Sequence, residues 1–341
     1  MKLAWTKKWG FAFAASALAL AALTGCAAGG QQGQGGQAEG GDALRKVTLV
    51  LDWTPNTNHT GLYVADAEGY YEEEGLDVDI IQPGDAGGDA VVASGEVEFG
   101  ISVQENVTLA RTQGFPLVSI AAVIQHNTSG FAAPASVGLK SPKDFEGKTY
   151  GGWGSPIESA MIESLMQEAG ADFSKVEMLS AGNSDFFTMK ENGIDFAWIF
   201  YGWTGIESEL RGEPIDIVYL TDYSKKLDYY TPVVITNEKL IADDPELVEK
   251  FVRATSKGYT YAAEHPEESA KALLAAVPEL NEELVVASQK WLSEKYIDDA
   301  ARWGEQKLEV WENYAAWMTE HGVMEGEFDA AKAFTNDFIP E

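Results

Sequence analysis

KVTLVLD at residues 46–52, GLYVADAEGYYEEE at 61–74 and DVDIIQ at 77–82 together indicate the fold of this chain. The first and third segments have the length and the β-branched content of strands. The middle segment carries apolar residues at helical spacing and is followed by Gly75, a common helix stop. A strand, a helix and a strand in this order form a βαβ unit, whose two strands lie parallel in one sheet.

The same alternation continues along the chain. It predicts a helix at 89–94, a strand at 97–102, a helix at 105–113 and a buried strand at 117–125. A second series begins near Gly138 and is predicted at 155–169, 176–179, 185–192, 194–200, 204–211 and 215–220, with a last strand at 232–236. Residues 245–334 are predicted to be nearly all helical, with Trp291, Trp303, Trp311 and Trp317 as packing aromatics.

This order predicts an α/β fold of two lobes, each with a doubly wound, mainly parallel sheet. The carboxyl ends of the strands in both lobes are then expected to face one cleft. We expect lobe one to comprise residues 44–132 and 222–341, and lobe two to comprise 133–221. The chain is therefore expected to cross the hinge twice.

The first 25 residues have the pattern of a signal peptide: Lys2, Lys7 and Lys8 precede an uncharged apolar run at 11–23. Leu23-Thr24-Gly25-Cys26 resembles the lipobox of bacterial lipoproteins, which implies that Cys26 is lipidated and becomes the first mature residue. Cys26 is the only cysteine, so no disulfide within the chain is possible. Residues 26–43 are rich in Gly and Gln and are expected to be a flexible tether. We therefore expect a location on the extracytoplasmic side of the cell membrane, held by the lipid.

The chain has 341 residues, with 24 basic and 54 acidic side chains and a net charge of −30. Such an acidic surface argues against nucleic-acid binding and favours neutral or cationic ligands over anions. The four histidines show no metal-ligand spacing, and the sequence has no Gly-rich phosphate loop or serine elbow. We expect a monomer without cofactor, metal or catalytic activity.

DWTPNTNHTGLYVA at 52–65 and GYYEEEGLDV at 69–78 resemble the thiamine-precursor binding proteins, a branch of the solute-binding proteins. IQPG at 81–84 and the segment from Phe196-Ala197-Trp198 to Gly202-Trp203 fit the same group. The resemblance implies a periplasmic-binding-protein-like fold, a formylated aminomethyl-pyrimidine as ligand, and the membrane subunits of an ABC importer as partners. The pattern at 69–78 is shared with relatives that bind sulfonates or nitrate, whereas WTPNTNH is more specific.

The loop after the first strand supplies three candidate ligand-binding residues: Trp53, Asn56 and His59. Trp53 lies where a parallel-sheet crevice opens, and its indole suits stacking on a flat ring; the alternative is a core tryptophan. Asn56 offers a hydrogen-bond donor and an acceptor to a pyrimidine, but Asn after Pro is also ordinary turn chemistry.

The predicted cluster in lobe two is Tyr201, Trp203 and Glu207. We expect Trp53 and Tyr201 to stack on opposite faces of the ring, while Asn56 and Glu207 hydrogen-bond to its edge. Glu207 near a helix start is also explained by the helix dipole. Additional candidates at strand ends are Gln104, Gln125, Gly154, Ser155 and Tyr230, although Ser155 is already explained as an N-cap before Pro156 and Glu158.

Two other functions remain open. The first is binding of a sulfonate- or nitrate-like anion, which usually recruits arginine or backbone amides; none of the five arginines lies in the candidate loops. The second is a pyrimidine-synthesising enzyme of the same fold. Such relatives use a lysine-bound cofactor and a Cys-rich segment, and the folded part of this chain has no cysteine.

Overall fold

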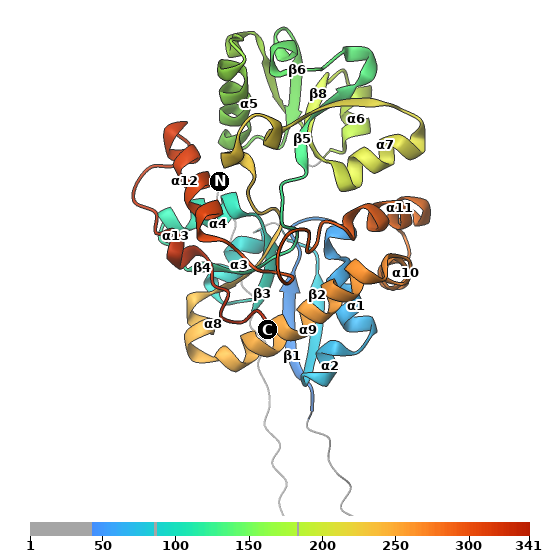
Figure 1. Cartoon of the computed structure of the whole chain (residues 1–341), viewed down its shortest axis with the longest axis vertical. Helices are drawn as coiled ribbons and strands as arrows, with labels where there is room; N and C mark the ends of the chain where they lie inside the picture. Colours follow the sequence, from blue (N-terminus) through green and yellow to red (C-terminus); the bar gives the residue numbers. More distant parts are fainter. Residues whose placement is uncertain (1–42, 85–86, 183) are drawn as a thin grey trace, which may run out of the picture. The chain divides into compact units, whose positions relative to one another are not determined.

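The computed structural model describes residues 43–84, 87–182 and 184–341, all of which lie within the compact unit Asp42–Glu341. The predicted signal peptide, the lipidation site at Cys26 and the tether lie outside the described residues, apart from residue 43. Two five-stranded sheets form the framework of the described unit (Figure 1).

The first sheet has the strand order β2 (Leu76–Ile81), β1 (Arg45–Val50), β3 (Phe99–Ser102), β10 (Val233–Asn237) and β4 (Leu117–Ala122). Strand β1 pairs in parallel with β2, with Val47 opposite Val78, and with β3, with Leu49 opposite Phe99. Strand β10 is antiparallel to both of its neighbours. The βαβ interpretation of residues 46–82 is therefore confirmed, but the sheet is mixed because a late strand inserts into it.

The second sheet repeats the pattern in the order β7 (Glu177–Ser180), β6 (Thr149–Gly152), β8 (Phe196–Phe200), β5 (Ser129–Pro134) and β9 (Ile215–Tyr219). Here β5 is the antiparallel strand. The chain thus passes from the first sheet to the second after β4 and returns after β9. The sequence did not indicate β5 or β6, which are rich in small residues. Gly130 is needed in β5 because a Cβ atom there would lie 2.5 Å from the carbonyl oxygen of Val218.

The α-helices that accompany the first four strands are α1 (Thr60–Ala67), α2 (Tyr70–Glu73), α3 (Gly88–Ser94) and α4 (Gln104–Thr112). Those of the second sheet are α5 (Pro156–Glu168), α6 (Phe186–Glu191) and α7 (Ile206–Arg211), the last preceded by a π-helical turn at Tyr201–Gly205. The C-terminal helices are α8 (Glu238–Asp243), α9 (Pro245–Glu264), α10 (Pro266–Ala276), α11 (Glu282–Leu292), α12 (Leu308–Glu320) and α13 (Ala330–Ala333). The single helix predicted at 61–74 is divided at Gly69, whose φ of 75° leaves the helical region.

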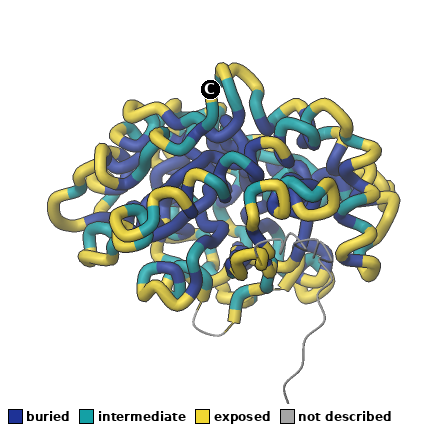
Figure 2. The backbone as a smooth tube through the Cα atoms, turned by 90° about the horizontal axis from the view of Figure 1, so that it is seen from below, coloured by how far each residue is buried: buried dark blue, intermediate teal, exposed yellow. Residues whose placement is uncertain are grey.

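Each sheet has its own apolar core. In Figure 2 the buried segments lie mostly in the interior of the molecule, and the exposed segments lie at its outside. In the first core Phe251 of α9 stacks on Phe99 with ring centroids 3.8 Å apart. Trp303, expected on a helix, lies in the non-helical segment between α11 and α12 and stacks on Tyr259. The described residues between 293 and 307 are therefore an exception to the predicted helical tail.

Helix α12 packs against both cores. Its Trp311 belongs to an apolar cluster on the first sheet, whereas Trp317 and Met318 belong to the core of the second sheet. The division of the chain into lobes by residue number remains a prediction. The packing places α12 beside the segment that returns to the first sheet, where Tyr229 stacks on Tyr314 at 4.0 Å.

Candidate functional site

A cavity of about 370 Å³ is lined by residues that follow strands of both sheets. Asp52, Trp53, Asn56 and Asn58 come from the loop after β1, and Val103, Glu105 and Asn106 follow β3. The second sheet contributes Trp153 after β6, Phe186 and Phe187 of α6, and residues 198–200, 203, 204 and 207, while Tyr229, Thr231 and Pro232 come from the returning segment. The cavity lies at the strand ends, where open α/β sheets usually bind ligands.

The loop after β1 is held together by its own polar side chains. The Asn56 amide oxygen accepts from the backbone N–H of Asn58 at 2.9 Å, and its Nδ2 donates to the Thr54 carbonyl at 3.0 Å. The backbone N–H of Asn56 in turn donates to Nδ1 of His59. Asn56 therefore lines the cavity, but its side chain already performs the turn role that was its alternative explanation.

His59 is fully buried and does not line the cavity. Because its Nδ1 accepts a backbone hydrogen bond, its proton lies on Nε2, which donates to Asp52 Oδ1 at 2.7 Å. Asp52 does line the cavity. His59 therefore orients the Asp52 carboxylate in the free protein, and its direct contact with a ligand stays a prediction; Asp52 was not among the predicted residues.

Tryptophans reach the cavity from both sheets. Trp53 has 40% of its surface exposed and Trp153 has 44%. The Trp153 ring lies 5.4 Å from that of Trp198, whose Nε1 is fixed by a hydrogen bond to Ser129 Oγ at 2.9 Å. Trp153 was not among the predicted ligand-binding residues, although its position just before the predicted helix start at Ser155 could have indicated that it lies at the cleft.

The predicted cluster of lobe two is only partly brought together. Trp203 and Glu207 line the cavity, and Glu207 accepts from Arg211 Nε at 2.8 Å. Tyr201 does not line it: its hydroxyl donates to Glu209, and its ring lies 5.5 Å from Trp291 of α11. Tyr201 and Trp203 lie two residues apart in the helical turn Tyr201–Gly205, so their side chains face different directions and only Trp203 reaches the cavity.

Gly202, in the same helical turn, is closely approached by α11. The Ser288 hydroxyl of this helix donates to the Gly202 carbonyl and pairs with Thr57 Oγ1 from the loop after β1. A Cβ atom on Gly202 would lie 3.1 Å from Leu292 and Trp291. Helix α11 therefore joins segments of both sheets at one edge of the cavity.

The remaining predicted residues have structural roles outside the cavity lining. Gln104 accepts from the backbone N–H of Tyr230 and donates to the Val310 carbonyl, and the buried Tyr230 hydroxyl accepts from the N–H of Lys307 at 2.9 Å. Ser155 caps α5, as its alternative explanation predicted. Gln125 is buried with its Nε2 unpartnered in the described part of the chain, and the backbone N–H of Gly154 donates to Glu158.

Glu105 is a further cavity residue that sequence reasoning missed. Its side chain is buried, and its Oε2 accepts from the hydroxyls of Tyr229 at 2.9 Å and Tyr314 at 3.2 Å. Burial raises the pKa of Glu105 to about 7, against the opposing effect of the two tyrosine hydrogen bonds. The helix dipole already explains an acid in the first turn of a helix, so nothing in the local sequence indicates that Glu105 is buried.

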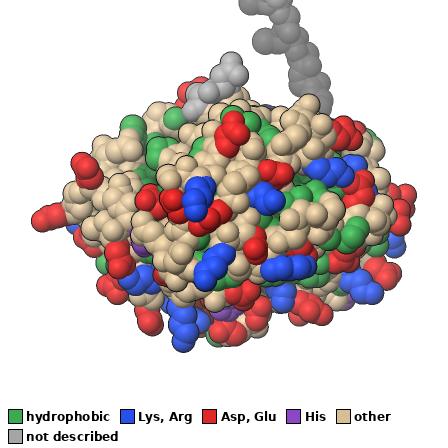
Figure 3. Space-filling view, turned by 90° about the horizontal axis from the view of Figure 1, so that it is seen from above, with side chains coloured by type: hydrophobic (Ala, Val, Ile, Leu, Met, Phe, Trp, Pro, Cys, Tyr) green, Lys and Arg blue, Asp and Glu red, His purple; other side chains and the backbone are tan. Residues whose placement is uncertain are grey.

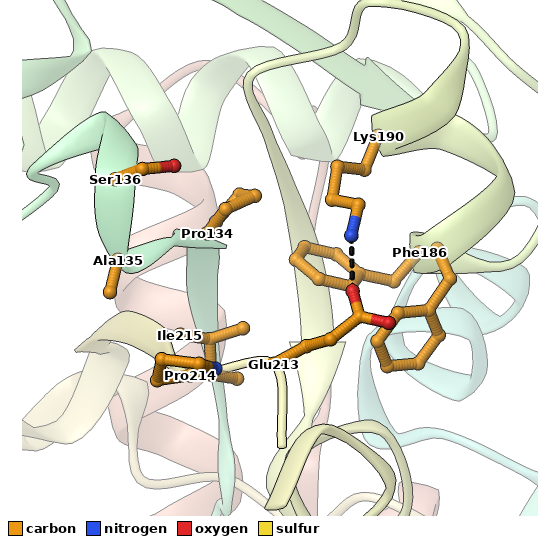
Figure 4. Close-up of a pocket in the computed structure, with 9 residues that line it drawn as sticks. Pro134, Ala135, Ser136, Phe186, Lys190, Glu213, Pro214 and Ile215 are labelled. Atoms are coloured by element: carbon orange, nitrogen blue, oxygen red, sulfur yellow. Dashed lines mark hydrogen bonds and ion pairs between the residues drawn. The ribbon is translucent and has the colours of Figure 1, made fainter. Parts of the chain in front are cut away.

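The charged side chains that line the cavity among the described residues are Asp52, Glu105, Asp185 and Glu207; none of them is basic. A smaller cavity of about 240 Å³ shares Phe186 and Phe187 of α6 with the first, and in it Lys190 pairs with Glu213 beside Phe186 (Figure 4). No residue predicted for the ligand site lies in this smaller cavity.

Comparison with known proteins places the chain in a family. The family described as "NMT1/THI5 like" matches residues 56–269. The chain belongs to this family. It is 31% identical over 303 residues to the formylaminopyrimidine-binding protein of Halalkalibacterium halodurans, covering 86% of this chain and 91% of that protein. It is 27% identical to the 4-amino-5-hydroxymethyl-2-methylpyrimidine phosphate synthase of Legionella pneumophila, covering 87% and 93%.

Among solved structures, the alkanesulfonate-binding protein SsuA from Xanthomonas axonopodis pv. citri matches with a TM-score of 0.65 at 12% identity, covering 85% of this chain and 98% of that one. At this identity the match shows the fold alone. The family resemblance of WTPNTNH and the periplasmic-binding-protein fold are thus confirmed. The relatives of this chain include a binding protein and a synthase, so membership of the family does not decide between binding and catalysis.

In the described part of the chain, no helix is long and apolar enough to cross a bilayer. The same residues hold no group of three or more His, Cys, Asp or Glu side chains arranged to bind a metal ion. Acidic and basic side chains alternate on the face shown in Figure 3.

Proposed function

We propose that this protein is an extracytoplasmic solute-binding protein of an ABC importer that captures a thiamine-related pyrimidine of the formylaminopyrimidine type. The observation that carries the proposal is the cavity lining, which combines tryptophans from both sheets with carboxylates and, among the described residues, no basic side chain. Flat rings stack on indoles, and amino groups donate to carboxylates. The similarity to a formylaminopyrimidine-binding protein supports the same ligand.

In the proposed complex the ring stacks on Trp53, and an aromatic residue of the second sheet covers its other face. Trp153 and Trp203 are the candidates for that second face, because both line the cavity and Tyr201 does not. Asp52, oriented by His59, and Glu207 hydrogen-bond to the ring edge. Closure of the two sheets over the ring extends the contact that α11 makes with Gly202. The closed, loaded form is what the importer's membrane subunits bind.

Two alternatives are less well supported. Capture of a sulfonate or nitrate would bring an anion beside Asp52, Glu105 and Glu207 without a basic partner in the described lining. Pyrimidine synthesis remains a function of some relatives, yet the enzymes of this kind that the sequence resembles depend on a Cys-rich segment, and the only cysteine here is Cys26.

The experiment is calorimetric titration of protein that starts after Cys26 with formylaminopyrimidine, thiamine, taurine and nitrate. Saturable binding of formylaminopyrimidine, with no heat from taurine or nitrate, is the expected result. Binding of an anion alone would overturn the proposed ligand. Conversion of an added substrate, followed by chromatography of the same mixtures, would overturn the assignment as a binding protein.

The lipid anchor at Cys26, the location outside the cytoplasmic membrane and the monomeric state complete the proposal. They are tested by expressing the full chain and its Cys26→Ser variant. The full chain is expected in the detergent-soluble membrane fraction and the variant in the soluble extracytoplasmic fraction. Light scattering of the soluble form is expected to give the mass of one chain.

A further inference from the structure

The two carboxyl oxygens of Glu105 have different surroundings. Oε2 accepts both tyrosine hydroxyls, from Tyr229 in the returning segment and from Tyr314 on α12. Oε1 has no hydrogen-bond partner within the described residues, although the side chain is about nine-tenths buried and lines the ligand cavity. Tyr229 lines the same cavity. One oxygen is thus held by the protein, and the other is left for whatever occupies the cavity.

This arrangement suits a protonated carboxyl group. A carbonyl-type oxygen has two lone pairs and can accept both tyrosine hydrogen bonds, while the other oxygen carries the proton and donates it. No basic side chain pairs with Glu105 in the described part of the chain. The ionisable groups that face it are Tyr229, Tyr314, Tyr150 of β6 and the Glu158 carboxylate of α5, and Glu158 disfavours a second negative charge.

We infer that Glu105 is a ligand-binding, specificity-determining residue whose Oε1 shares a proton with a ring nitrogen of an uncharged, weakly basic heterocycle. This inference rests on the proposed function, in which the cavity is the ligand site. It also explains why an anionic ligand is disfavoured, since an anion would face either a buried carboxylate or a single donor. A ring nitrogen, by contrast, completes the hydrogen bonding of Oε1.

The proton balance of the inferred complex is simple. One proton lies between Oε1 and the ring nitrogen, whichever atom holds it. The free protein carries this proton only below the pKa of Glu105, which burial raises to about 7. Binding at pH 8 must therefore take up nearly one proton from the buffer, whereas binding at pH 6 needs little uptake. Affinity falls as pH rises above 7 for the same reason.

The test is calorimetry of formylaminopyrimidine binding at pH 6, 7 and 8, each in two buffers of different ionisation enthalpy. Wild-type protein is compared with Glu105→Gln and with the control Glu312→Gln, which changes an exposed acid on α12. The titration of the free ligand is measured separately and subtracted. We expect the wild type and the control to take up protons increasingly from pH 6 to pH 8. Glu105→Gln should lose this uptake and bind at least about tenfold more weakly at pH 6.

Equal affinity and equal proton uptake in Glu105→Gln would overturn the inference and leave Glu105 as an acceptor for the two tyrosines only. If formylaminopyrimidine does not bind wild-type protein, the proposed ligand is wrong. The same titrations with 4-amino-5-hydroxymethyl-2-methylpyrimidine, an uncharged aminopyrimidine, then separate the two ideas. Binding of this pyrimidine with proton uptake that Glu105→Gln lacks supports the inference, and absence of binding by both pyrimidines refutes it.

Discussion

Replacement of Trp53 by Ala tests the ligand cavity most directly. The side chain has 40% of its surface exposed in the free protein, which is about 100 Å² if a tryptophan exposes roughly 250 Å² when free. A ring stacked on one face covers about half of this, and about 50 Å² at 25 cal/mol per Å² contributes about 1.2 kcal/mol. Aromatic stacking adds about 0.5–1.5 kcal/mol. The dissociation constant of the pyrimidine should therefore rise about 15- to 90-fold.

The same change should barely affect the empty protein. Trp53 is among the exposed large apolar residues and belongs to none of the apolar cores of the described unit. Surface substitutions usually change stability by less than about 0.5 kcal/mol, which is about 1–2 °C in Tm for a chain of this size. Phe115→Ala is the matched control, because Phe115 is 48% exposed and does not line the cavity.

Affinity is measured by calorimetry and stability by thermal unfolding without ligand. An affinity for Trp53→Ala within twofold of wild type would refute the stacking role. A fall in Tm of more than about 5 °C would show that Trp53 is a core residue, which was its alternative explanation. Weakened binding in Phe115→Ala as well would indicate a general effect of removing exposed aromatics.

Four further predictions concern individual contacts. Tyr201→Phe should bind the pyrimidine within twofold of wild type by calorimetry, because the lost hydroxyl donates only to exposed Glu209; a tenfold loss would return Tyr201 to the ligand site. Glu158→Ala should lower the free energy of unfolding in urea by about 3–5 kcal/mol, since Tyr150 and three backbone N–H groups lose a buried acceptor; a loss below 1 kcal/mol would contradict this. Burial lowers the pKa of His126, but Asp228 and Asp299 outweigh this effect and raise the pKa. The stabilisation that protonated His126 contributes is therefore full below about pH 6.5 and is lost as the pH rises through the folded-state pKa. His126→Gln should flatten that part of the plot of Tm against pH. Burial raises the folded-state pKa of Glu105 to about 7, so its stabilisation, on the order of 3 kcal/mol, is full below the unfolded pKa, falls as pH rises toward 7 and is lost above 7. Glu105→Gln should therefore unfold at a higher temperature than wild type at pH 8, and an unchanged Tm difference between the two proteins from pH 6 to pH 8 would refute the raised pKa.

Much of the fold could be predicted because hydrophobic periodicity changes between strands and helices. Strands β1 and β2 were each located within about two residues, and the single helix predicted between them spans α1 and α2, which are divided at Gly69. Strands β5 and β6 could not be found in this way, because their small residues carry little hydrophobic signal. Their glycines are explained by tertiary contacts: at Gly152 a Cβ atom would lie 1.8 Å from Glu158 Oε1. A contact between residues of different elements has no local signature in one sequence.

The sequence indicated some of the side chains that line the candidate site but not others. Trp53, Asn56, Trp203 and Glu207 all line the cavity. Tyr201 lies outside the lining because the direction of its side chain depends on how the short helical turn packs against α11, which follows about 80 residues later in the sequence. Glu105 was missed because its burial comes from Tyr229 and Tyr314, two residues that only the folded chain brings to it.

The acidic lining of the cavity favours an uncharged ligand because each carboxylate already has a local partner. Asp52 accepts from His59, Glu207 from Arg211, and Asp185 from backbone N–H groups at the start of α6. Glu105 is held by two tyrosine hydroxyls and keeps a proton near neutral pH. A cationic ligand would gain little from acids that are already paired, and an anion would find no basic side chain in the described lining. A neutral ring with donors and one acceptor nitrogen can hydrogen-bond to the free lone pairs without changing the charge of the site. The acidity of the whole chain therefore matters less for ligand choice than the way these four acids are individually paired.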